Sequence, residues 1–323
     1  MSYAYEQMLF APKWYHYLTI LLLLPISLLY GVFMYLRRIL LPKKQFDIPI
    51  VSIGNLIVGG SGKTPFVIAL ASRYKDVTII SRGYGRKSEG LLQVSQKGEI
   101  LATVEQSGDE PMLMAISLPS ASVIVSEDRQ NAIQLAKEQG AKLIILDDGF
   151  NRVKIKKYEI LLKPEMIKNP LPFPAGPFRE FWFSEKYADM VLHEGKAFIR
   201  KVSYDDLRPK MLLVTAISNP HRLDPYLPEG IVQKVYLEDH AYFEEETLKR
   251  LMQESGAESL LVTQKDAVKM QGFKLPLSIM KLKLEIQNEI FAQIDEYIDS
   301  KTKSIKSNRL QGHSVKKEDM DEK

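Results

Sequence analysis

The stretch that decides the fold runs from Val51 to Ala71 and reads VSIGNLIVGGSGKTPFVIALA. A short apolar strand leads into a glycine-rich turn, and a helix is expected to follow, which is the order of a phosphate-binding loop. The usual spelling, G-x-x-x-x-G-K-[ST], requires a glycine at position 57, where this chain has Ile57. Backbone N–H groups and a helix N-terminus at such a turn bind phosphate well. The stretch therefore predicts a nucleotide-binding loop whose first part differs from the usual pattern.

Each residue of this loop has an expected role. Lys63 would reach the β- and γ-phosphates, and the Thr64 hydroxyl would hold Mg²⁺. Pro65 is tolerated because the first turn of a helix contains N–H groups without an intrahelical partner. The residues expected to bind the nucleotide are Gly59, Gly60, Ser61, Gly62, Lys63, Thr64 and Pro65.

A second motif, LIILDDGF from Leu143 to Phe150, places Asp147 and Asp148 directly after an apolar strand. Carboxylates at the carboxyl edge of a strand beside a phosphate loop can bind Mg²⁺ directly or through water. The chain has no D-x-x-G motif, and TQKD (Thr263–Asp266) has its lysine one place later than guanine recognition requires. The two motifs together predict binding of ATP with Mg²⁺.

Apolar runs alternate with amphipathic stretches through the middle of the chain, which predicts an α/β fold with a mainly parallel sheet. We expect a P-loop NTPase-like domain over residues 45–205 and a smaller α/β lobe over 206–300. The expected strands of the first are Ile50–Ile53, Val77–Ile80, Ser122–Val125, Leu143–Leu146 and Glu159–Leu162; its helices are Phe66–Arg73, Glu110–Ile116 and Arg129–Gln139. The expected elements of the second are Met211–Thr215, Val232–Tyr236, Phe243–Glu254, Ser259–Val262 and Asn288–Ile298.

The two ends of the chain differ from this middle. Tyr17–Leu36 is twenty residues without a charge, and a helix of that length is about 30 Å long, the thickness of the hydrocarbon layer of a bilayer. Arg37 and Arg38 follow it, so the positive-inside rule keeps the rest of the chain in the cytoplasm. Residues 1–44 are therefore expected to associate with a membrane, by spanning it or by lying in its interface; a helix buried in a soluble core is the alternative. Residues 301–323 are charged and are expected to be disordered.

The composition excludes several other classes of protein. The 323 residues include no Cys, so disulfides, a thiolate nucleophile and Cys-based zinc sites are excluded, and the five His show no metal-ligand spacing. A net charge of +4 is too small to indicate nucleic-acid binding.

A series of motifs now gives a specific resemblance. The Ile57-containing loop GNLIVGGSGKTP, together with SRGYGR, GDEP, SEDR, DDGF, PAGPFRE, ISNPHR, EDHAYF and TQKDAVK, resembles the tetraacyldisaccharide 4'-kinases, the lipid A 4'-kinases, over about residues 20–270. The resemblance implies transfer of the ATP γ-phosphate to the 4'-hydroxyl of tetraacyldisaccharide 1-phosphate, which forms lipid IVA. It also implies work at the cytoplasmic face of the inner membrane, where a four-chain lipid substrate resides.

The resemblance implies a catalytic base, Asp109 of GDEP, working with His240 of the D-H pair. The two lie 131 positions apart in different predicted lobes, so we expect them to meet only when the lobes close over the substrate. Glu110 is expected to help bind the substrate. The chain departs from the family at Asn151 and Arg152, where Gln and His are usual, so any role of those two residues does not carry over.

Further charged residues follow from the same resemblance. Arg129 and Arg179 are candidates for neutralising charge on the transferred phosphate. Glu180 is a candidate ligand of the metal or of its water. Arg82 and Arg86 are candidates for binding the substrate's 1-phosphate or nearby lipid headgroups.

A different class of protein remains possible from the residues alone. A membrane-tethered P-loop ATPase that switches partners would need the same loop and the same apolar helix. It would need neither a base for a sugar hydroxyl nor the D-H pair, and its ATP turnover would not require a lipid acceptor.

Overall fold

The computed structural model describes residues 3–59, 62–164 and 167–321. Its larger sheet has the strand order β4-β3-β5-β2-β6-β1-β7-β8. Strand β3, near one edge, pairs antiparallel with both of its neighbours, β4 and β5, and the remaining strand pairs of this sheet are parallel. The predicted α/β class with a mostly parallel sheet is confirmed. The strands are β1 (Ile50–Gly54), β2 (Val77–Ser81), β3 (Leu92–Gln96), β4 (Glu99–Ile100), β5 (Ser122–Val125), β6 (Leu143–Asp147), β7 (Tyr158–Lys163) and β8 (Met190–His193).

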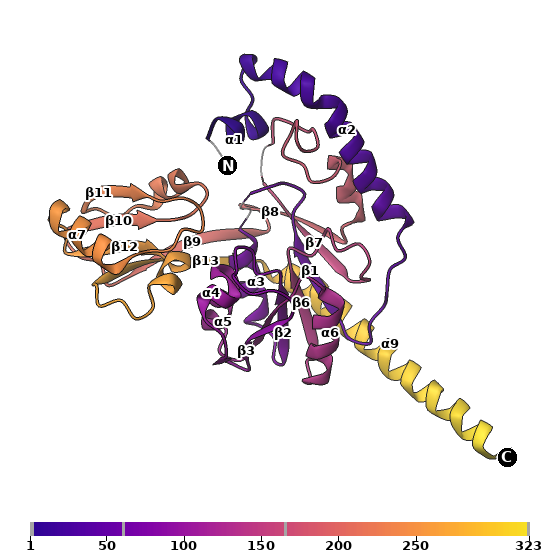
Figure 1. Cartoon of the computed structure of the whole chain (residues 1–323). Coiled ribbons are helices and arrows are strands. Elements are labelled where there is room, and N and C mark those ends of the chain that lie inside the picture. Colours follow the sequence, from indigo (N-terminus) through magenta and orange to yellow (C-terminus); the bar gives the residue numbers. More distant parts are fainter. Residues whose placement is uncertain (1–2, 60–61, 165–166, 322–323) are drawn as a thin grey trace.

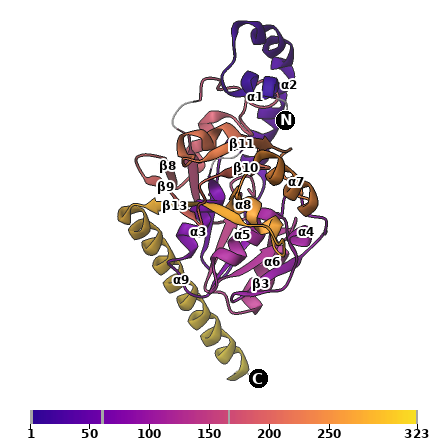
Figure 2. The same cartoon turned by 90° about the vertical axis from the view of Figure 1, so that its left-hand side faces the viewer.

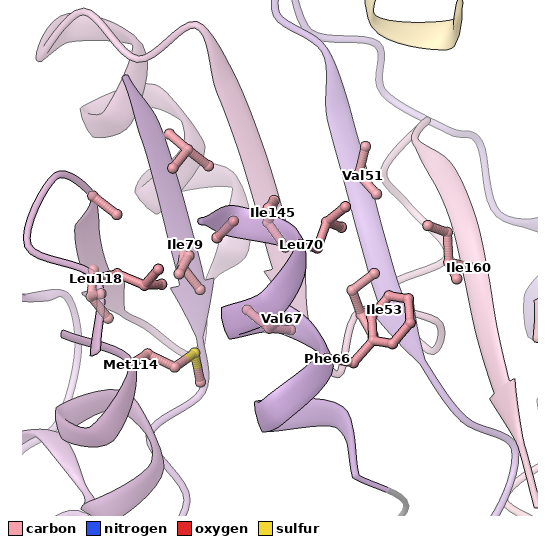
Figure 3. Packing of buried hydrophobic residues seen from close by; sticks show 14 of the residues in the cluster. Val51, Ile53, Phe66, Val67, Leu70, Ile79, Met114, Leu118, Ile145 and Ile160 are labelled. Atoms are coloured by element: carbon pink, nitrogen blue, oxygen red, sulfur yellow. The ribbon is translucent and has the colours of Figure 1, made fainter. Parts of the chain in front are cut away.

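Helices cover both faces of this sheet because its central strands are apolar on both sides. Val51 and Ile53 point to one face, which is covered by α3 (Lys63–Ala71), α5 (Asp109–Ser117) and the start of α9 (Asn288–Asp321). Figure 3 shows Phe66, Val67 and Leu70 of α3 lying against these strands. The opposite face, which includes Ile50, packs against α6 (Arg129–Glu138). The short α4 (Val104–Ser107) precedes α5.

A second, smaller sheet forms the other lobe. Its order is β11-β10-β12-β13-β9, parallel apart from β9, which pairs antiparallel with β13. The elements are β9 (Phe198–Asp205), β10 (Met211–Thr215), η3 (Pro220–Tyr226), β11 (Ile231–Tyr236), α7 (Glu245–Ser255), β12 (Ser259–Thr263), α8 (Gln264–Ala267), η4 (Val268–Met270) and β13 (Leu277–Ile286). In Figure 1 this lobe lies to one side and is joined to the larger domain by β9 and β13.

The boundaries between the lobes differ from those expected. The second sheet begins with β9 at Phe198, before the expected position 206, and the side chain of Phe198 packs in the core of the first domain. Helix α9 does not belong to the second lobe, because Ile290 and Ile294 pack in that same core and the Tyr297 hydroxyl donates to Ile50 O at 3.0 Å. The chain thus enters the second lobe through β9 and returns through β13.

The amino-terminal segment lies along the larger domain. It consists of α1 (Tyr3–Phe10), the short helix η1 (Trp14–His16) and α2 (Tyr17–Leu40), and α2 runs beside the segment that follows β7 (Figures 1 and 2). One stripe of α2 is buried, formed by Ile20, Ser27, Gly31, Met34 and Arg38. The rest of its apolar surface is exposed: in the helical stretch Trp14–Leu40, which is long and apolar enough to cross a membrane, 22% of the most apolar window is buried. The alternative of a helix buried in a soluble core is therefore not what the structure shows.

The carboxyl end differs from the expectation of disorder. Helix α9 continues to Asp321, through residues 301–321, and its distal half projects away from the body of the molecule (Figure 1). Its first turns are fixed by packing on the sheet, and each further residue of a helix that has already formed adds one hydrogen bond.

Candidate active site

The phosphate loop lies where the motif places it, between β1 and α3. Gly62 adopts a left-handed conformation, with φ of 73°, and α3 begins at Lys63. Thr64 is buried in the first turn beside Pro65. Gly60 and Ser61 lie outside the described residues. Strand β1 and the amino-terminal end of α3 therefore lie in the order expected of a phosphate loop.

Asp148 faces this loop across the edge of the sheet. Strand β6 pairs parallel with β1, with Ile53 opposite Asp147, so the two motifs end side by side. The Asp148 carboxylate lies 3.5 Å from Lys63 Nζ and accepts a hydrogen bond from Arg179 Nη1 at 2.7 Å. Burial alone would raise the pKa of Asp148, but these two cations hold it below its usual range. Asp148 also has a φ of +50°, an uncommon conformation that is found at functional sites.

Asp147 differs from its neighbour and suits a cation. It is buried, it accepts a hydrogen bond from Ser81 Oγ at 2.8 Å, and its Oδ1 has no hydrogen-bond partner among the residues that the structure describes. Burial, with the nearby negative charges of Glu110 and Asp148, raises the pKa of Asp147 to about 6. Within the described ranges no group of three or more His, Asp or Glu could hold a metal by itself, but Mg²⁺ is usually held by one or two carboxylates together with substrate phosphates and water. The residues fit Mg²⁺ that arrives with a nucleotide.

The proposed base and its partner are in direct contact. Asp109 is the first residue of α5, and its carboxylate Oδ2 lies 2.9 Å from His240 Nδ1. This corrects the expectation that the two residues meet only when the lobes close: the second lobe already lies against the amino-terminal end of α5. His240 has a φ of +64°, and its ring lies 5.3 Å from the ring of Tyr84 in the SRGYGR loop.

The contact changes the titration of both groups. Burial raises the pKa of Asp109, but the hydrogen bond with His240 and the charges of Lys265 and Lys269 outweigh it, so this pKa lies below its usual value. The hydrogen bond to Asp109 raises the pKa of His240, against a smaller opposing effect of burial. The contact therefore shifts the two pKa values in opposite directions, that of Asp109 downward and that of His240 upward.

The four expected arginines have different surroundings. Arg179 reaches Asp148, as described above. Arg129 is buried at the start of α6 and donates to Ser126 O, and burial with the nearby Arg152 lowers its pKa to about 10. Arg82 is exposed. Arg86 donates to Glu127 and to Gly90 O, so it fixes its own loop and is not free for the predicted phosphate role.

Glu180 is engaged away from the phosphate loop. Both of its oxygens accept from Arg38 at 2.7 Å, and its side chain is fully buried. Arg38 also donates to Phe150 O at 3.0 Å, and Arg37 donates to Asn151 O at 2.9 Å. The structure therefore does not support Glu180 as a metal ligand. Instead, the contacts of Arg37 and Arg38 join the end of α2 to Glu180 and to the loop that follows Asp148.

Sequence reasoning missed two lysines of the second lobe. Lys265 Nζ lies 3.2 Å from Glu110 Oε1 and 3.7 Å from Asp109 Oδ2, and Lys269 Nζ lies 3.7 Å from the same Asp109 oxygen. Both belong to the TQKDAVK motif, which the resemblance had singled out without a role. Their spacing of four residues, which brings side chains to one side of a helix, was the available signal.

Comparisons with known proteins identify the family of the chain. The sequence profile of the family described as Tetraacyldisaccharide-1-P 4'-kinase matches residues 19–208 and 199–302. Proteins named tetraacyldisaccharide 4'-kinase are similar to the chain: that of Helicobacter pylori (strain HPAG1) is 48% identical over 85% of this chain and 88% of its own length, and that of Aliarcobacter butzleri is 43% identical over 91% and 96%. A crystal structure of LpxK from Aquifex aeolicus in complex with ATP has 30% identity and a TM-score of 0.74, covering 87% of this chain and 99% of that one. The chain therefore belongs to the tetraacyldisaccharide 4'-kinase family.

Proposed function

We propose that this protein transfers the γ-phosphate of ATP to the 4'-hydroxyl of tetraacyldisaccharide 1-phosphate and so forms lipid IVA. The observation that carries the proposal is the contact of 2.9 Å between Asp109 and His240, which unites a base from one lobe with an imidazole from the other. A hydrolase that works only as a timer has no need of this pair. The family membership and the phosphate loop support the same reaction.

The chemistry divides among the residues of the site. The 4'-oxygen attacks the γ-phosphorus, the bond from this phosphorus to the β–γ bridging oxygen breaks, and ADP leaves with that oxygen. Asp109 takes the proton of the hydroxyl, and such a base typically contributes about 10²–10⁴-fold. His240 orients the carboxylate, while Lys63 and Arg179 stabilise charge on the phosphates. Thr64 and Asp147 would hold Mg²⁺, which supplies positive charge at the phosphate oxygens.

We also propose that α2 holds the enzyme on the cytoplasmic face of the inner membrane without crossing the bilayer on its own. The buried stripe extends from Ile20 to Arg38, which is about 27 Å along the helix at 1.5 Å per residue. Gly31 lies directly against Phe181 and Pro172, and Ser27 donates to Pro172 O. If α2 crossed the bilayer, the segment that contains Pro172 and Phe181 would have to enter the hydrocarbon layer with it. The exposed apolar side of α2, including Leu22 and Leu29, is the side available to lipid.

Labelled ATP and tetraacyldisaccharide 1-phosphate in mixed micelles test the reaction. We expect label on the sugar, Mg²⁺ dependence, and loss of transfer but not of ATP binding in Asp109→Asn. Hydrolysis that is independent of the acceptor would instead support the tethered ATPase.

Flotation with anionic phospholipid vesicles tests the attachment. We expect Leu22→Glu/Leu29→Glu to leave the vesicle fraction, since both side chains are 72% exposed on α2. Leu207→Glu is the matched control, because Leu207 is an exposed leucine of the second lobe and its change should leave flotation intact. Unchanged flotation of the double variant would show that other surfaces bind the membrane.

A further inference from the structure

A buried lysine of the second lobe reaches the base of the first. Lys269 belongs to η4, and its side chain is 1% exposed. Its Nζ lies 3.7 Å from Asp109 Oδ2 and 3.5 Å from Asp266 Oδ1, and it donates to Ala241 O at 3.0 Å. Burying an ammonium group is costly unless it is paired and hydrogen-bonded. Here the partners are Asp109 of α5, Asp266 of α8 and the carbonyl of Ala241, the residue after His240.

The contacts of Asp266 extend this arrangement to the backbone of His240. Asp266 is fully buried, and its Oδ1 accepts from the Ala216 N–H at 3.2 Å. The Ala216 carbonyl in turn accepts from the His240 N–H at 3.0 Å. These contacts form a closed ring. It runs from Lys269 through Asp266 and Ala216 to His240, and then through Asp109 back to Lys269. Such a ring explains how His240 is kept at a φ of +64°, which otherwise costs about 1–3 kcal/mol.

We propose that Lys269 is a positioning residue for phosphoryl transfer, which holds its positive charge against Asp109 and, through Asp266, holds His240 in place against it. The inference rests on the proposed function and deepens it, because it assigns a role to the TQKDAVK motif. Lys269 does not need to touch either substrate. It acts through the two residues that the proposed reaction uses.

The charges around the pair give this role a definite sign. Asp109 faces the imidazole of His240 and two ammonium groups, those of Lys265 and Lys269, and the anionic neighbour on its own helix is Glu110. His240 faces Asp109, Asp239 and Lys265. Lys265 also pairs with Glu110 and is 20% exposed, whereas Lys269 is enclosed. Removal of the Lys269 charge therefore weakens the force that keeps Asp109 ionised, since an opposite charge within about 4–6 Å lowers the pKa of a carboxyl by roughly 1–3 units.

The test measures the pH dependence of kcat and KM for lipid phosphorylation by the full-length protein in mixed micelles. Lys269→Gln keeps a donor for Ala241 O and removes the charge. We expect the acid limb of the kcat/KM profile to move up by roughly one pH unit and the KM for ATP to stay unchanged. At neutral pH Asp109 remains ionised in this variant, so any fall in kcat there reports a loss of position of the Asp109–His240 pair. This limb belongs to the coupled pair and not to one residue.

Two further variants separate charge from folding. Lys269→Arg keeps the positive charge, so its acid limb should stay at the wild-type position even where kcat falls. Asp266→Asn removes a negative charge, so it should lower kcat without any upward move of the limb. Lys234→Gln is the matched control, because Lys234 pairs with Asp224 at 2.6 Å on the exposed surface of the same lobe, and it should behave as wild type. ATP binding and thermal unfolding establish which variants are folded.

The outcomes distinguish a failure of the role of Lys269 from a failure of the proposed function. A folded Lys269→Gln with a wild-type acid limb overturns the inference, whether or not kcat falls, because a merely structural lysine would not move the limb. A Lys269→Arg limb that moves upward also overturns it, and this result is available even where Lys269→Gln does not fold. If the wild-type protein hydrolyses ATP without labelling the lipid, the proposed function fails and the inference fails with it.

Discussion

Replacing Glu180 by Met should destabilise the packing of the apolar helix rather than disable metal binding. Glu180 is fully buried and its two oxygens accept from Arg38 Nε and Nη2 at 2.7 Å each. The change leaves the Arg38 guanidinium buried without its counter-charge. Loss of one partner of a buried pair typically costs about 3–5 kcal/mol.

The double change Arg38→Met/Glu180→Met provides the matched comparison. With both charges gone no uncompensated charge remains, and an apolar replacement of a buried pair is often neutral. The remaining expected loss is the hydrogen bond from Arg38 to Phe150 O, of 3.0 Å, at about 1–3 kcal/mol for a carbonyl left unsatisfied. The double variant should therefore be more stable than Glu180→Met alone.

Tryptophan fluorescence during urea unfolding measures this directly. The chain contains two tryptophans, and Trp182 lies two residues after Glu180, so its fluorescence reports on this segment. ATP turnover at saturating Mg²⁺ is measured in parallel. A Glu180→Met variant with an unchanged urea midpoint and no Mg²⁺-dependent turnover would refute this reasoning and restore Glu180 as a metal ligand.

Three other outcomes are expected. Lys63→Ala should lower turnover by several orders of magnitude, because a charge next to the phosphates is lost inside a water-poor site; activity within about tenfold of wild type, in a steady-state assay, would contradict its role. Asp109→Asn and His240→Ala should each lower kcat by about 10²–10⁴-fold, and the double variant should lose little more than the worse single one because the two act together; multiplied losses would show independent roles. Because the pKa of His240 is raised above its ordinary value of 6.5, its contribution to stability is complete below that value and is lost as the pH rises through the raised pKa. The difference in urea midpoint between wild type and His240→Ala should therefore shrink from pH 6 to pH 9, and a constant difference would contradict this assignment.

The sequence predicts elements well where burial makes a strand continuously apolar. Ser122–Val125 and Met211–Thr215 have the expected bounds, since both are buried throughout. Strands β9 and β13 were missed because their exposed and buried residues alternate and their sequences carry several charges. They connect the lobes and are only partly buried, so their sequences lack the continuous apolar run that predicts a strand.

For the site, the sequence predicts the local motifs but not the contacts between residues that are distant in the chain. The phosphate loop and Asp148 are local motifs, and the parallel pairing of β1 with β6 brings them together as expected. The Arg38–Glu180 pair and the contact of Lys269 with Asp109 join residues that are far apart in the chain. The spacing of Lys265 and Lys269 indicates a shared side of a helix, but no local pattern shows that this side faces Asp109. A single sequence shows that Glu180 is an acid next to Arg179, but only the fold shows that it is buried against α2.

The insertion of the second lobe between β8 and α9 has a consequence for synthesis on the ribosome. The eight strands of the larger sheet are complete at His193, but their core still lacks Ile290, Ile294 and Tyr297 of α9. Roughly 100 further residues must be added first, which takes about 5–20 s at the usual 5–20 residues per second. In the folded protein the ring centroids of Tyr158 and Tyr297 are 4.8 Å apart. Before α9 has been synthesised, the Tyr158 ring and the apolar surface around it are not covered by that helix. The nascent chain therefore presents a chaperone-accessible face until its last helix emerges, and truncation before residue 290 should yield aggregates rather than a functional kinase domain.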